Sequence, residues 1–253
     1  MSQSILLIYT VSDINNVGLY MCGQFALGSG FDWGGFCIRL DIRDLVDSKD
    51  KLRFSEVFKP SQKIPIVTQQ GAGHQLCQAT WSLLLEETDG GFKPHAKYAT
   101  FNSKSSRLTE SPVSKKAFKR SRCIIPASSF VEGDGPKGHR YYHQLTPESG
   151  MIAFGGLYRE WIHSKTGELM YSASIITLLG HPKLKDVHQK SMPLMLPLDQ
   201  PALAHDWLNS SLQATERFND LLVPTLFDSF EILPIDRPGN KLPIGERYKI
   251  ERD

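Results

Sequence analysis

The chain has 253 residues, of which 40% are hydrophobic and 22% are charged, and its formal net charge is +2 at pH 7. This composition is typical of a soluble globular protein that forms one large domain or two small ones. It excludes a membrane-spanning helix, because no apolar run approaches the roughly 18 residues that such a helix needs.

The N-terminal segment and the cysteines argue against secretion and against a metal centre. Residues 1–20 contain no Lys or Arg, and the apolar run Ile5–Val11 is followed by polar residues without a small-residue cleavage site. No Cys-x-x-Cys pair exists among the four cysteines, which are Cys22, Cys37, Cys77 and Cys123. We therefore expect a protein of the reducing cytoplasm, with no zinc site or redox motif.

Short strands and turns dominate the predicted elements in the first half of the chain. In chain order we predict a strand at Cys22–Leu27, a turn at Gly28–Gly30, a helix or loop over residues 42–53, a strand with an edge proline at Ile64–Val67, and a strand centred on Trp81 at Gln75–Leu85.

The second half continues with strands and a few helices. Helices are predicted at Ser114–Arg122, at Asp199–Leu208 with Asp199 as N-cap, and at Leu212–Leu222. Strands are predicted at Arg122–Pro126, Ser128–Glu132, Tyr141–Leu145, Met151–Tyr158, Tyr171–Thr177 and Glu231–Ile235. Because there is no repeat and no linker, the sequence predicts a single α+β domain rich in short strands.

Positive charge is concentrated in one segment. Between Lys93 and Arg122 there are nine basic residues and one acid, Glu110, so the segment carries +8 and the rest of the chain carries 2 − 8 = −6. Such a concentration favours an anionic partner, with nucleic acid as the first candidate. The alternative is a solvated helix face.

The tripeptide Met21-Cys22-Gly23 has chemical interest only if translation starts at Met21. Removal of that methionine leaves Cys22 with a free α-amine beside its thiol, and this pair condenses with an aldehyde to give a five-membered thiazolidine ring. An internal cysteine has an amide nitrogen and cannot react in this way. In isolation the tripeptide is more typical of a small apolar residue in a strand.

Three further side chains could take part in chemistry. Asn102 ends a β-prone stretch, and most asparagines in such a position cap a turn. Glu132 follows Phe130 and Val131, an apolar setting that would raise the pKa of a carboxyl group and suit it to acid–base catalysis, although a solvated strand end is the alternative. His188 is one of eight histidines and is uninformative alone.

Taken together and in this order, the motifs resemble the SRAP family, the SOS response-associated peptidase fold of abasic site processing proteins. The resemblance spans residues 21–253 and leaves residues 1–20 as an N-terminal extension. It rests on Met21-Cys22-Gly23, Phe58–Val67, Trp81, Asn102-Ser103-Lys104, Arg122–Glu132, Phe154-Gly155-Gly156-Leu157, and His188 shortly before Met192-Pro193.

The resemblance implies a strand-rich mixed sheet with a barrel-like core, and covalent capture of abasic sites in single-stranded DNA. Cys22 is then the nucleophile, Asn102 positions the cysteine or the opened sugar, and Glu132 and His188 transfer protons. The DNA contacts implied are Lys104, Arg107, Arg122 and Trp81, although core packing is the favoured interpretation of Trp81. No cofactor, metal or membrane is implied, and we expect a monomer.

Several positions depart from the family pattern. Lys104 stands where an arginine is usual in the family, and Gln24 stands where an arginine commonly follows Cys-Gly. Both changes lower the expected affinity for DNA. Gly133 replaces a tryptophan, so an aromatic wall is expected to be missing. The spacing from His188 to the following proline is one residue longer than in many members.

The residues before Met21 leave three alternatives open. Met21 is the true start, or the chain cuts itself before Cys22, or the protein binds DNA without crosslinking. The corresponding rival functions are a cysteine-dependent peptidase or self-processing hydrolase, and a non-covalent binder of single-stranded DNA.

Overall fold

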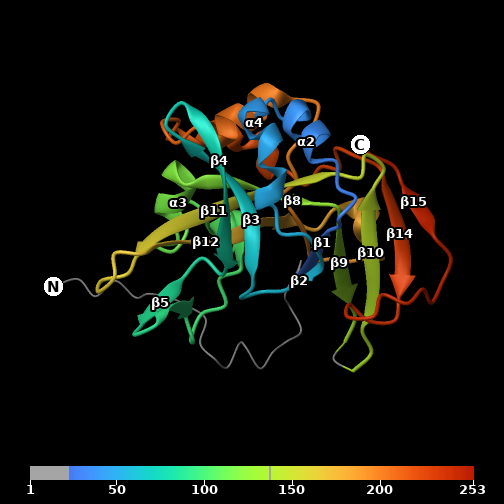
Figure 1. Cartoon of the computed structure of the whole chain (residues 1–253). Coiled ribbons are helices and arrows are strands. Elements are labelled where there is room, and N and C mark those ends of the chain that lie inside the picture. The colour runs from blue at the N-terminus through green and yellow to red at the C-terminus, as the bar shows by residue number, and fades with distance from the viewer. Residues whose placement is uncertain (1–22, 137) are drawn as a thin grey trace.

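The computed structural model describes residues 23–136 and 138–253, and strands make up most of it (Figure 1). One six-stranded sheet has the order β15-β14-β10-β9-β1-β2. Its strands are β1 (Gln24–Leu27), β2 (Ser55–Phe58), β9 (Ser129–Asp134), β10 (Tyr141–Pro147), β14 (Phe230–Ile235) and β15 (Tyr248–Ile250).

The second sheet closes on itself. Its order is β11-β8-β3-β4-β12-β13, and an additional pairing of β11 with β12 joins five of these strands into a barrel, which confirms the barrel-like core. The strands are β3 (Lys63–Gln70), β4 (Gly73–Trp81), β8 (Arg122–Ala127), β11 (Ile152–Ile162), β12 (Leu169–Leu179) and β13 (Ser191–Pro193), with β7 (Asn102–Lys104) added in parallel to β12.

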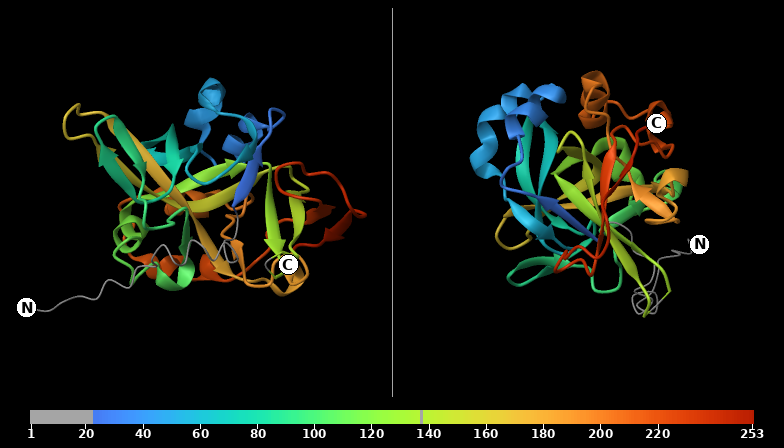
Figure 2. Two further views of the ribbon diagram at one scale, coloured as in Figure 1. Left: turned by 90° about the horizontal axis from the view of Figure 1, so that it is seen from below. Right: turned by 90° about the vertical axis from the view of Figure 1, so that its right-hand side faces the viewer.

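Shorter elements complete the described chain. They are the helices α2 (Trp33–Arg39), α3 (Lys115–Arg120) and α4 (Pro201–Leu208), the hairpin of β5 (Leu85–Thr88) and β6 (Gly91–Pro94), and the 3-10 turns η1 (Arg43–Lys51), η2 (Ser105–Arg107), η3 (Pro182–Leu184), η4 (Thr215–Phe218) and η5 (Asp220–Leu222). Helices α2 and α4 lie at the same end of the molecule in Figure 1 and in the right-hand view of Figure 2. Across the described residues, no helix is long and apolar enough to cross a membrane.

Aromatic side chains fuse the two sheets into one core. Phe25 on β1 lies 5.0 Å from Trp81 on β4 between ring centroids, and Phe130 on β9 lies 5.7 Å from Phe154 on β11. These rings are almost completely buried. Offset and edge-on contacts between buried rings add to the free energy gained by burying their area. The structure is therefore one α+β domain, as the sequence predicts.

The Gly155-Gly156 pair in β11 is explained by close packing. A Cβ atom at Gly155 would lie 2.5 Å from Cδ2 of Leu194, and one at Gly156 would lie 2.8 Å from the backbone oxygen of Ser174. Because neither approach leaves room for a side chain, only glycine fits here in the barrel wall.

Four sequence-based expectations need correction, and one helix was not predicted. The predicted strand Gln75–Leu85 is not one strand, because β4 ends at Trp81 and β5 begins only at Leu85. Pro65 lies in β3, which is between β4 and β8 and is not an edge strand. Strand β3 pairs with β8 at Val67, so the missing N–H of Pro65 interrupts no hydrogen bond between β3 and β8. Helix α4 has Gln200 and not Asp199 at its N-cap. Residues 212–222 form two 3-10 turns and not one helix. Helix α2 was missed, although Asp32 caps it by accepting a hydrogen bond from the Gly35 N–H at 2.9 Å.

Candidate active site

Glu132 lies near the carboxyl end of β9, and its side chain is 3% exposed. Its partner on the neighbouring strand β10 is His143. Since a carboxylate is rarely buried to this degree without a polar environment of its own, this end of the sheet is the first place to look for chemistry.

His188 is fixed against the residue that follows Glu132. Its Nδ1 donates a hydrogen bond to the Gly133 carbonyl at 2.8 Å. Because a carbonyl can only accept, Nδ1 carries a proton and Nε2 of the neutral ring is left as an acceptor. Burial lowers the pKa of His188 below its usual 6.5, against the opposing effects of the Gly133 hydrogen bond and the Asp134 charge. The ring is therefore a neutral base near neutral pH.

Asp134 fastens the loop that carries His188 to the end of β9. It accepts hydrogen bonds from the backbone N–H of Gln189 at 2.9 Å and of Gly135 at 2.7 Å. Burial alone would raise the pKa of this carboxyl group, but the backbone donors outweigh it and the pKa lies below 3.8. Asp134 therefore stays ionised and holds His188 beside Glu132.

Asn102 opens β7, which pairs with β12 at Ile175. At the same end of β12, Thr177 pairs with Lys104 of β7 on one side and with Pro193 of β13 on the other. The strand that carries Asn102 and the strand that follows His188 therefore flank one end of β12. In this way the fold brings the segments of Asn102 and His188 toward the same end of the barrel.

Cys22 lies outside the described residues, so its predicted role stays a prediction. The described chain starts at Gly23, and the next residue, Gln24, pairs with Val131 on β9. Within the described residues, the buried Oε1 of Gln24 has no hydrogen-bond partner. This unsatisfied amide oxygen lies on the strand next to Glu132, at the position where the family pattern has an arginine.

The structure contradicts the predicted DNA contact of Arg122. Its side chain is 1% exposed, and the guanidinium donates to five backbone carbonyls. The acceptors are those of Trp207 (2.7 Å), Phe118 (2.7 Å), Lys119 (2.8 Å), Asn209 (2.6 Å) and Leu212 (3.1 Å). Burial lowers the pKa of Arg122 to about 10, which leaves it charged at neutral pH. With every donor direction used inside the protein, no phosphate can reach it.

Trp81 is also internal. It is fully buried, and its Nε1 donates to the Phe101 carbonyl at 2.9 Å. The packing interpretation of Trp81 is therefore correct, and stacking on a DNA base is not available to it.

Apart from Lys93, Lys97 and the buried Arg122, the basic residues of the segment lie in two places. Lys115, Lys116, Lys119 and Arg120 belong to α3, which packs against β8 and β11 on the far side of the barrel from β9 and β10 (Figure 1). Lys104 and Arg107 instead directly follow Asn102 and belong to β7 and η2. Only the second group lies next to a candidate catalytic residue.

The ring of Tyr142 covers Gly133, the position where the sequence predicts that an aromatic side chain is missing. A Cβ atom at Gly133 would lie 2.5 Å from Cδ1 of Tyr142, the residue that pairs with Gly133 from β10. The Tyr142 ring thus occupies the space that a side chain at Gly133 would fill. The pair Tyr141-Tyr142 is the sequence signal for this ring, but from the sequence alone it predicts only a strand.

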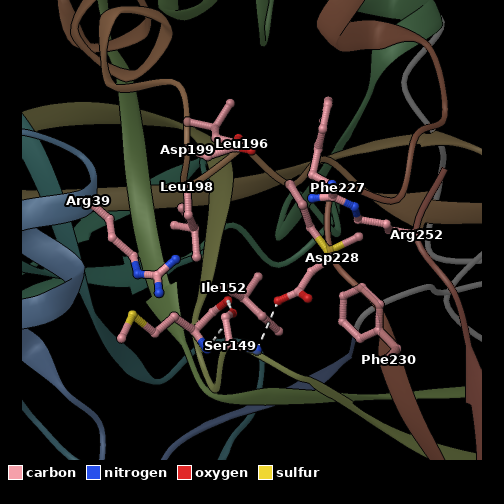
Figure 3. Close-up of a pocket in the computed structure, with 13 residues that line it drawn as sticks. Arg39, Ser149, Ile152, Leu196, Leu198, Asp199, Phe227, Asp228, Phe230 and Arg252 are labelled. Atoms are coloured by element: carbon pink, nitrogen blue, oxygen red, sulfur yellow. Dashed lines mark hydrogen bonds between the residues drawn. The ribbon is translucent and has the colours of Figure 1, made fainter.

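A cavity of about 130 Å³ lies elsewhere in the fold (Figure 3). Arg39 and Arg252 approach it from opposite sides, and Asp228 accepts a hydrogen bond from the Ser149 N–H at 3.1 Å. None of the predicted site residues lines this cavity. In the part of the chain that is described, no group of three or more His, Cys, Asp or Glu side chains could hold a metal ion.

The fold and the site together define a class: a β-barrel joined to an antiparallel sheet, with a buried carboxylate beside a neutral histidine. Residues 21–241 match the family described as SOS response associated peptidase (SRAP), and the chain belongs to that family.

Relatives in *Bacillus subtilis* strain 168 agree with this assignment. Abasic site processing protein YoaM is 30% identical over 223 residues, covering 83% of this chain and 89% of its own. Abasic site processing protein YobE is 30% identical over 240 residues, covering 90% and 100%.

Solved structures show the same fold. A protein from *Bacteroides thetaiotaomicron* has a TM-score of 0.62 at 19% identity, covering 85% of this chain and 93% of its own. A phage-related protein from *Bordetella bronchiseptica* has a TM-score of 0.60 at 18% identity, covering 88% and 100%.

Proposed function

We propose that this protein captures abasic sites in single-stranded DNA as a covalent thiazolidine, through Cys22 with a free α-amino group. One observation carries the proposal: neutral His188 is hydrogen-bonded to the residue after buried Glu132, so a base and a carboxyl group share one site. The names of the relatives support abasic sites as the target, and the family match begins at residue 21, next to Cys22.

The reaction balances without any co-reactant. An α-amine with a pKa near 7.7–8.0 is already partly neutral at pH 7, and it attacks the aldehyde of the ring-opened abasic sugar. The carbinolamine loses water to give an imine, and the cysteine sulfur then adds to the imine carbon. One C–N bond and one C–S bond form, and the aldehyde oxygen leaves as water.

Glu132 and His188 divide the proton transfers in this scheme. Nε2 of His188 accepts a proton from the attacking amine, because its Nδ1 is already committed to the Gly133 carbonyl. Glu132 delivers a proton to the departing hydroxyl. Asn102 orients the cysteine or the opened sugar, and Lys104 and Arg107 hold neighbouring phosphates.

Self-processing is a second candidate function. It is favoured by the residues that precede Cys22 in the sequence, since they must be absent for the amine to react. In this scheme the peptide bond before Cys22 is cleaved by the chain itself, and Cys22→Ser or Glu132→Ala blocks the cleavage. A full-length chain whose intact mass stays constant during incubation would contradict it.

The proposal is tested with a chain that starts at Met21 and whose mass confirms an N-terminal Cys22. Incubation with a uracil-excised single-stranded oligonucleotide should give an adduct that survives denaturation. Cys22→Ala should abolish this adduct, and so should a single alanine inserted between Met21 and Cys22, which keeps the thiol but moves the free amine from Cys22 to the inserted alanine. Equal adduct from the insertion variant would overturn the thiazolidine scheme.

A further inference from the structure

Two tyrosines expose their rings beside the candidate active site. Among the described aromatic side chains, only Tyr141 (41%) and Tyr248 (40%) are exposed. They come from separate strands, β10 and β15, yet both contact the same imidazole. The ring centroid of His143 lies 5.8 Å from that of Tyr141 and 6.4 Å from that of Tyr248, with interplanar angles of 76° and 83°.

His143 has unused hydrogen-bonding capacity. Its side chain is 9% exposed, and its buried Nδ1 has no hydrogen-bond partner within the described part of the chain. Burial lowers the pKa of His143 below 6.5, so the ring is neutral near neutral pH. A buried polar atom without a partner costs stability, so its presence in the fold calls for an explanation.

The register of the sheet places this group at the active site. His143 pairs with Glu132, and Tyr141 pairs with Asp134, which holds the His188 loop through Gln189. Side chains that face each other across paired strands lie on the same side of the sheet. The rings of Tyr141 and His143 are therefore on the Glu132 side of β9 and β10.

The charges near Tyr141 and Tyr248 favour an uncharged base over a phosphate as the group that contacts them. The negative charge of Asp186 acts on both Tyr141 and Tyr248, and that of Asp134 acts on Tyr141. Carboxylates repel a phosphate but do not prevent the stacking of an uncharged ring. Positive charge is available next to His188, from Arg140 and Lys190. A DNA strand can therefore follow the cations and turn one base toward the tyrosines.

We propose that Tyr141, His143 and Tyr248 form a stacking site for the nucleobase adjacent to the abasic sugar. The base stacks on the exposed tyrosine rings, and the His143 ring between them holds both in place. Stacking on aromatic side chains tolerates any base, so the site fixes the position of the strand and not its sequence. This inference rests on the proposed function, because it identifies how the same site holds the strand.

The test uses an oligonucleotide that binds but cannot crosslink through Cys22. It contains a tetrahydrofuran analogue of the abasic site, which has no aldehyde, and a 5-iodouracil on its 5′ or 3′ side. Irradiation should attach the iodouracil to Tyr141 or Tyr248, as mapped by peptide mass spectrometry. Tyr141→Leu and Tyr248→Leu should each raise the Kd about tenfold, the lower range of the effect expected for one stacked base.

A matched control is Tyr171→Leu. Tyr171 is a half-buried tyrosine on β12, and it lies eight residues before Leu179, the residue at the end of β12 that faces the site. Loss of its ring should therefore leave the Kd within about twofold. His143→Phe keeps the ring but removes Nδ1, and should weaken binding less than Tyr141→Leu.

The outcomes separate this site from the proposed function. Binding with a photo-adduct that maps away from both tyrosines would overturn the stacking site alone, as would an unchanged Kd for the Tyr141→Leu, Tyr248→Leu double variant. Failure of the unsubstituted chain to bind the oligonucleotide would overturn both proposals.

Discussion

The run Arg122–Glu132 has a buried charged residue at each end, and the two ends have opposite environments. At Arg122, the protein supplies five carbonyl acceptors for one guanidinium. Polar groups near Glu132 have hydrogen-bonding capacity left over within the described part of the chain. There, the one contact given for Nε2 of His188 is Ser191 Oγ at 3.5 Å, and Nδ1 of His143 has no partner.

The difference distinguishes a structural charge from a site of chemistry. A buried polar group that is fully bonded within the protein stabilises the fold and has nothing left for a ligand. Polar groups that stay incompletely bonded lower stability, and they persist where a substrate completes them. Four predictions test this contrast, from the largest expected effect to the smallest.

Replacing the structural charge should damage the fold most. Arg122→Met leaves several buried carbonyls without donors, and we expect it to lower the free energy of unfolding by about 3–5 kcal/mol. Urea unfolding measures the effect. Arg120→Met, two residues away and exposed, should change stability by no more than about 0.5 kcal/mol. Equal stability of the two variants would contradict the structural role of Arg122.

Replacing the carboxylate should damage the reaction and spare the fold. Glu132→Gln keeps the shape of the side chain but cannot exchange a proton, so the rate of adduct formation should fall about 100-fold, the lower limit of general acid–base catalysis. The rate is measured on denaturing gels with abasic single-stranded DNA. A wild-type rate in this variant would exclude Glu132 from proton transfer.

Two of the buried histidines, His143 and His188, should make the fold sensitive to acid. Burial lowers the pKa of both His143 and His188 below 6.5. The unfolded chain therefore binds more protons than the folded chain once the pH falls below about 6.5. Their contribution to stability is complete above that pH and is lost as the pH falls toward the folded-state pKa, by at most about 1.4 kcal/mol per pH unit for each histidine.

Urea unfolding at pH 7.5, 6.5 and 5.5 measures this slope. His143→Phe should make it shallower, because phenylalanine retains the ring and cannot be protonated. An identical slope in the variant would show that His143 does not titrate with folding.

The smallest effect is expected at the phosphate contacts. Lys104→Gln should weaken binding to single-stranded DNA several-fold and reduce the dependence of log K on log salt by about one. Lys116→Gln is the matched control, since Lys116 is also exposed but belongs to α3. If Lys116→Gln has the larger effect, the DNA runs over α3 and not past Asn102.

The sequence predicted the fold class and most strands, because buried strands such as β8, β11 and β12 leave short apolar runs in the sequence. It failed where distant residues decide the outcome. Arg122 looked like a DNA contact because its five acceptors come from residues 118–119 and 207–212, whose proximity no local pattern reveals.

The candidate site shows the same limit. Glu132 and His188 could be selected by motif, but their link runs through the Gly133 carbonyl, which has no sequence signal. His143 carries no motif at all, and only the register of β9 with β10 places it opposite Glu132. Tyr142 covers Gly133 for the same reason.

The central claim is that both the amine and the thiol of Cys22 bond to one sugar carbon. It is tested most directly by mass spectrometry of the N-terminal peptide from the adduct with abasic single-stranded DNA. We predict a DNA remnant on Cys22 with the loss of one water, formed without a reducing agent, whereas Cys22→Ser should give a stable adduct only after borohydride reduction. An adduct on a lysine, or none from a chain with a confirmed N-terminal Cys22, would contradict the claim.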